Sequence, residues 1–227
     1  MKTENKKEEI KEKTNTELYV QLGIIAILAL VIVFNIGRIY SAPKSIESTG
    51  LATGIESVSA SGIIPKGTPA VYGAELGVKY DYITPSNPGL TEATISKLSQ
   101  YEDMELNSEQ MQRYIRIGGS IACEYCCGAK SLIFSNGERA CGCAHSYAMR
   151  GLAKYLLTKH PEMADEEILS ELGKWKVLFF PGIHEQKAKA LEANGIDPNN
   201  YINLASNLYR GIEQGQLSGS GQMVGGC

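Results

Sequence analysis

The sequence lacks an excess of basic charge, a repeat of fixed period and a recognisable catalytic constellation. Its 227 residues include 22 lysines and arginines against 25 aspartates and glutamates, a formal net charge of −3. Because nucleic-acid-binding domains usually present a basic stripe, we expect no nucleic-acid partner. No carboxylate pair, Ser/His/Asp set or phosphate-binding glycine loop stands out, so a binding function is favoured over an enzymatic one.

Cysteine is absent from most of the chain and concentrated in one short stretch. Five of the six cysteines and one of the three histidines lie between Cys123 and His145, and the sixth cysteine is the last residue, Cys227. Soft donors this dense are rarely packing residues; they are typical of metal ligands, disulfide partners or redox thiols. Any chemical function is therefore expected in this stretch.

Charge is absent from a long stretch near the N-terminus. Residues 1–17 are polar, with five lysines and five glutamates, and are expected to form a cytoplasmic charged tail. Residues 18–38 are mainly apolar, and a helix of this length covers about 30 Å, the hydrocarbon thickness of a bilayer. The positive-inside rule then predicts a single-pass cell-membrane protein with a cytoplasmic N-terminus and an extracytoplasmic domain.

The remaining residues are expected to form a linker, one domain and a tail. Residues 39–62 are rich in Ser, Gly, Ala and Thr, a composition typical of flexible linkers. Residues 63–216 are expected to form an extracytoplasmic Cys-rich domain, and 217–227 a Gly/Ser-rich tail. Hydrophobic periodicity predicts a short strand over 78–83, and helices over 90–101, 106–121, 146–160, 164–180, 184–194 and 200–214.

A turn signal divides the Cys-rich stretch into two halves. Asn136-Gly137 is the strongest short hairpin signal, because both residues accept positive φ. The sequence therefore predicts a β-hairpin between a Cys-rich turn and a second Cys pair that enters a helix. The predicted fold class is mainly α with a small β-hairpin, comprising an N-terminal transmembrane helix and a helical Cys-rich ectodomain.

The order of these parts resembles a treble-clef zinc fold, in which a zinc knuckle, a hairpin and the first turn of a helix form one site. The resemblance rests on Cys123 and Cys126 at CxxC spacing with a glycine soon after, and on the pair Cys141-Gly-Cys143 before a helix. The close-set cysteines also loosely resemble those of membrane-anchored, extracytoplasmic PCYCGC-motif proteins of prokaryotes. That resemblance implies export and metal binding, with no assigned activity.

The donor set suits several metals. Zinc takes four tetrahedral nitrogen or sulfur ligands, and a closed shell makes its site structural. The same donors also suit copper(I) and, less well, an iron–sulfur cluster. The predicted metal ligands are Cys123, Cys126, Cys127, Cys141, Cys143 and His145, with Cys227 as a further candidate.

Two alternatives to metal binding use the same cysteines. In an oxidising compartment they could form disulfides and staple a partner-binding domain; bridges between close neighbours are strained, so disulfides would join the two halves of the stretch. A cycling thiol pair would instead make a thiol–disulfide or electron-transfer protein. His160 and His184 are expected at the surface, and Met149 in the core.

Overall fold

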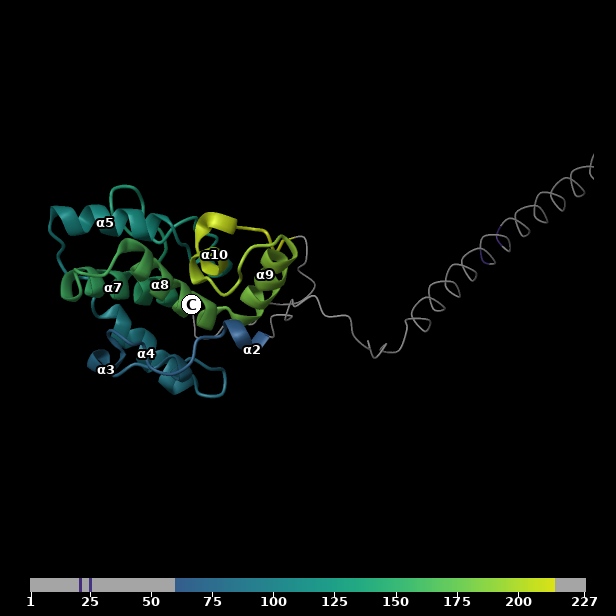
Figure 1. The fold of residues 1–227 in the computed structure, drawn as a ribbon, viewed down its shortest axis with the longest axis horizontal. Coiled ribbons are helices and arrows are strands. Elements are labelled where there is room, and N and C mark those ends of the chain that lie inside the picture. The colour runs from purple at the N-terminus through teal and green to yellow at the C-terminus, as the bar shows by residue number, and fades with distance from the viewer. Residues whose placement is uncertain (1–20, 22–24, 26–59, 215–227) are drawn as a thin grey trace, which may run out of the picture. The chain divides into compact units, whose positions relative to one another are not determined.

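The computed structural model describes residues 60–214, together with Gln21 and Ile25 (Figure 1). The chain divides into two compact units, Met1–Ile55 and Glu56–Cys227. Gln21 and Ile25, both helical, belong to the first unit. Every other element described below belongs to the second.

The predicted membrane topology requires correction. Within the described residues, no helix combines the length and apolar character that crossing a bilayer requires. The longest helix there has 16 residues, about 24 Å, and carries charged side chains. This finding contradicts the transmembrane part of the predicted fold class and the predicted cell-membrane localisation. The proposed span 18–38 lies outside the described residues apart from Gln21 and Ile25, as do the tails 1–17 and 217–227 and most of the linker 39–62.

The domain is helical, and its main helices are close to the predicted ones. Five predicted helices are found with their ends shifted by no more than three residues: α4 (Pro88–Ser99), α5 (Ser108–Gly119), α7 (Ala144–Lys159), α8 (Asp165–Phe179) and α9 (Pro181–Ala193). The shorter elements are α2 (Ala60–Ile63), α3 (Gly73–Leu76), η1 (Tyr80–Tyr82), α6 (Glu124–Cys127), α10 (Tyr201–Ala205) and η2 (Asn207–Tyr209).

Two other predictions were wrong in detail. The segment predicted as a strand, 78–83, contains the 3-10 turn η1 instead. Its apolar and polar residues alternate because Val78 and Tyr80 are buried between exposed neighbours. The predicted helix over 200–214 breaks after α10, because Ser206 is extended and its hydroxyl caps η2 by accepting from Leu208 N.

The predicted β-hairpin is also absent as a pair of strands within residues 60–214. A single antiparallel bridge joins Ile133 to Arg139, and only Gly137 of the turn has positive φ, at 85°. The ladder does not extend because neighbouring backbone groups bond elsewhere. Leu132 N donates to Gly118 O and Ile121 O, at 3.0 and 2.9 Å, at the end of α5.

Helix α7 forms the centre of the domain. In Figure 1 it lies beside α8, with α5 and α4 on opposite sides of the pair, and it contacts all three of these helices. Its buried residues extend around most of its circumference, as expected for a central helix. Met149, at 1% exposure, is a core residue as predicted. This arrangement brings the N-terminal end of α7 into the interior.

Candidate metal centre

The first half of the Cys-rich stretch is held by one turn of helix. Cys123 is the N-cap of α6, and the turn ends at Gly128, whose φ of 69° is readily adopted only by glycine. Residues three apart on a helix lie on the same side, so α6 brings Cys123 and Cys126 together. Cys123 is fully buried and Cys126 partly so.

The second half leads directly into α7. Cys143 is the N-cap of this helix, and its Sγ accepts a hydrogen bond from Ser146 N at 3.4 Å. The Ser146 hydroxyl lies 3.4 Å from the same sulfur. His145 follows in the first helical turn and is fully buried. A cysteine in the capping position thus directs its sulfur toward the end of the helix.

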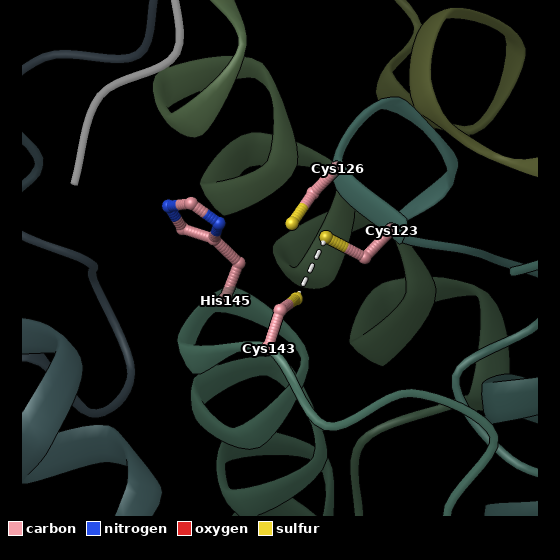
Figure 2. A group of neighbouring side chains, drawn as sticks. All are labelled: Cys123, Cys126, Cys143 and His145. Carbon is pink, nitrogen blue, oxygen red and sulfur yellow. Dashed lines mark hydrogen bonds between the residues drawn. The ribbon is translucent and has the colours of Figure 1, made fainter. Parts of the chain in front are cut away.

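These two segments bring four donors together. The ligand atoms of Cys123, Cys126, Cys143 and His145 all lie within 4.8 Å of one another. In Figure 2 the three sulfurs converge between α6 and the start of α7, and the imidazole lies beside them. This group could hold a metal ion.

Two of these sulfurs form a hydrogen-bonded thiol pair. The Sγ atoms of Cys123 and Cys143 are 3.3 Å apart, and both cysteines are free (Figure 2). The hydrogen bond from Cys123, assisted by those from His145 and Ser146 and opposed by burial, lowers the pKa of Cys143 well below its usual value. The same hydrogen bond, together with burial, raises the pKa of Cys123. The two thiols therefore titrate as a coupled pair and not independently.

The other cysteines of the stretch are oxidised. Cys127 and Cys141 form a disulfide between the two halves, the kind of bridge that the sequence predicted if disulfides formed. Cys126 is disulfide-bonded as well. The structure therefore separates the predicted ligands: Cys127 and Cys141 are bonded to each other, and Cys227 lies outside the described residues.

A buried ion pair anchors the α6 turn. Lys176 of α8 is fully buried, and its Nζ donates to Glu124 Oε1 at 2.9 Å and to Ala205 O at 2.8 Å. Arg210 also pairs with Glu124. Burial acts to raise the pKa of Glu124, but Lys176 and Arg210 outweigh it and lower the pKa. This network fixes the residue between Cys123 and Tyr125, and so the direction of the Cys123 sulfur.

Aromatic rings enclose the imidazole. The His145 ring centroid lies 4.6 Å from that of Phe179 and 5.2 Å from that of Phe180. Both phenylalanines are at most 1% exposed. Apolar side chains therefore shield the centre from water on this side. The low dielectric constant there strengthens electrostatic interactions with the sulfurs.

Some supporting residues were missed by sequence reasoning. Lys176 lies four residues after Leu172 and three before Phe179, and both of these residues are fully buried. Its position on the apolar face of the helix therefore indicated a buried lysine. His184, predicted at the surface, is fully buried: Nδ1 lies 2.8 Å from Phe180 O. Burial lowers the pKa of His184 well below its usual value, with Lys176 adding to the effect.

Comparison of the chain with known protein families, with curated proteins and with solved structures found no match. The resemblances to the treble-clef fold and to PCYCGC-motif proteins therefore stay hypotheses.

Proposed function

We propose that this protein binds one zinc ion through Cys123, Cys126, Cys143 and His145. Three cysteines and one histidine are an established donor set of structural zinc sites. The observation that carries the proposal is the convergence of all four ligand atoms within 4.8 Å of one another. Cys126 joins the set when its disulfide is reduced.

The spacing of the donors supports a tetrahedral ion. Zinc–sulfur bonds of about 2.3 Å place tetrahedral donors about 3.8 Å apart. The limit of 4.8 Å within the group is about 1 Å longer, and the 3.3 Å between the Cys123 and Cys143 sulfurs is slightly shorter. Small side-chain movements therefore suffice, and four protein donors leave no open position. This supports a structural role over a catalytic one.

The charge of the surroundings also supports zinc. Three thiolates and a neutral imidazole around Zn²⁺ carry a net charge of −1, whereas the same donors around copper(I) carry −2. Lys176 is fully buried and interacts electrostatically with Cys123. Lys176 and Arg210 both pair with Glu124, so these three groups together carry a net charge of +1. This charge offsets the −1 of a zinc complex and leaves a copper(I) complex with an uncompensated negative charge.

Zinc titration of the reduced full chain, in competition with a chromophoric chelator, tests this proposal. We expect one zinc per wild-type chain, and at least tenfold weaker binding by Cys143→Ser and His145→Ala. The matched controls Cys127→Ser and His160→Ala should bind as wild type does. Absence of zinc binding by the reduced chain, or equal losses in the controls, would contradict the proposal.

A second candidate function is supported by a different group of sulfurs. Cys127, Cys141 and Cys143 also lie within 4.8 Å of one another, which places a disulfide beside a free thiol. Such an arrangement is typical of thiol–disulfide exchange. A chain that binds no metal after reduction, yet exchanges its disulfide with a small dithiol, would favour this function.

A further inference from the structure

Two groups of sulfurs meet at one residue. Cys143 belongs both to the set of four donors and to the group that contains the Cys127–Cys141 disulfide, and each group spans no more than 4.8 Å. Its backbone N–H also donates to Cys141 Sγ at 3.5 Å. A change in the bonding of Cys143 therefore affects the metal ligands and the disulfide together.

The sulfurs differ in their access to solvent. Cys127 is exposed, whereas Cys141 and Cys143 are 7% and 8% exposed and Cys123 is fully buried. A dissolved disulfide therefore reaches Cys127 first. From Cys127 to Cys143, and from Cys143 to Cys123 at 3.3 Å, the sulfurs form a continuous path inward.

We propose that the metal centre is redox-gated: a disulfide-bearing molecule oxidises Cys127, and the oxidation passes to Cys143 and Cys123, which releases the metal. This inference rests on the proposed zinc site. The partner it implies is a small or protein disulfide that can reach an exposed thiol.

The transfer balances at each step. Where the Cys127–Cys141 disulfide is reduced, the Cys127 thiolate attacks the external disulfide, which forms a mixed disulfide and releases one thiolate. The Cys143 thiolate then attacks Cys127 Sγ, either in this mixed disulfide or in the Cys127–Cys141 bond; a Cys143–Cys127 bond forms, and the displaced sulfur leaves with the electron pair and takes a proton.

In the last step, the Cys123 thiolate attacks Cys143 Sγ. A Cys123–Cys143 bond forms, the Cys143–Cys127 bond breaks, and Cys127 leaves as a thiolate. The sum is two-electron oxidation of Cys123 and Cys143 with two-electron reduction of the external disulfide or of Cys127–Cys141. Because a disulfide sulfur is no longer a thiolate ligand, the metal loses two of its four donors.

Zinc release under oxidation tests the gate. The reduced full chain is loaded with one equivalent of zinc and treated with oxidised glutathione, while a zinc-sensitive dye follows release and peptide mapping locates the disulfides. We expect wild type to release zinc and to form the Cys123–Cys143 disulfide. Cys127→Ser should release zinc at least tenfold more slowly, because the sulfurs that remain in the Cys-rich stretch are partly buried, as in Cys126, or almost fully buried.

Cys141→Ser is the matched control, because it removes the disulfide partner of Cys127 and leaves the exposed Cys127 thiol in place. It should release zinc at least as fast as wild type. Two results would contradict redox control of the metal centre. One is zinc release from Cys127→Ser at the wild-type rate, and the other is zinc release from the wild-type protein without formation of a Cys123–Cys143 disulfide.

Different results would reject the zinc site and the transfer of oxidation between sulfurs. If the reduced chain binds no zinc, the proposed function is wrong, and mapping of the metal-free chain then tests the transfer alone. A Cys123–Cys143 disulfide that forms in wild type but not in Cys127→Ser would support the transfer of oxidation from Cys127 to these two cysteines. Its absence from both proteins would reject the path as well.

Discussion

At the scale of single residues, buried charges hold the Cys-rich stretch in place. Arg150 of α7 is fully buried, pairs with Glu102, and donates through Nη1 to Cys141 O at 2.8 Å and Leu132 O at 3.3 Å. One side chain thus connects both sides of the bridged turn to α7. Its hydrogen bonds add to the bond across the turn from Ala140 N to Leu132 O at 3.1 Å.

Loss of the Arg150 side chain should be costly. Arg150→Ala leaves Glu102, at 5% side-chain exposure, with only the half-exposed Arg139 as an ionic partner, so we expect a loss of about 3 kcal/mol in the free energy of unfolding. Arg139 also pairs with Glu102 but is 51% exposed, and Arg139→Ala should cost less than about 1 kcal/mol. Urea denaturation followed by circular dichroism measures both values. Equal losses would show that burial does not distinguish the two arginines.

At the scale of elements, the close packing of α7 on α4 depends on a glycine. A Cβ atom added at Gly151 would collide with the backbone carbonyl of Leu98 and lie 3.2 Å from Glu102 N. Backbone atoms cannot move aside as a flexible side chain can. The small residue therefore determines how closely the two helices approach, and with them the position of the whole of α7, including its N-cap Cys143.

Gly151→Ala tests this packing. Despite the higher helix propensity of alanine, we expect a loss of about 1–3 kcal/mol, because the two helices must separate. Gly89→Ala in α4 is the control, because its added Cβ would meet no atom of another part of the chain within 4 Å. The control should be neutral or slightly stabilising by thermal denaturation. A Gly151→Ala protein as stable as wild type would contradict the packing argument.

At the scale of the whole molecule, the donors come from segments that are held by different parts of the fold. The α6 turn is anchored to α8 by Lys176, and Cys143 and His145 belong to α7. A metal bound to all four donors therefore cross-links the main helices. Because an unfolded chain has no preformed site, binding free energy adds to folding stability.

Zinc should consequently raise the melting temperature of the reduced protein. At free zinc about 100 times the dissociation constant, the gain is about 2.7 kcal/mol. For a domain of this size, this corresponds to a rise of about 5–10 °C. Differential scanning calorimetry with and without zinc measures the rise, and a chelator should reverse it. Cys143→Ser should show at most about half of this rise, because tenfold weaker binding reduces the gain to about 1.4 kcal/mol. An equal rise in this variant would place the effect elsewhere.

The sequence by itself determined the positions of the main helices and where the soft donors gather. Periodicity and capping are local properties, as in the capping box of Asn107 and Gln110. It was wrong about His184 and the hairpin, because burial and competing hydrogen-bond partners are not local.

Only the tertiary structure decided which sulfurs meet. Spacing along the chain allows several cysteine pairings, whereas one turn of α6, the N-cap position of Cys143 and the buried Lys176–Glu124 pair select one. These features place Cys127 beside Cys141 and bring Cys143 to both groups of sulfurs. The physical reason is that distances across the fold depend on helix packing, which involves residues far apart in the sequence.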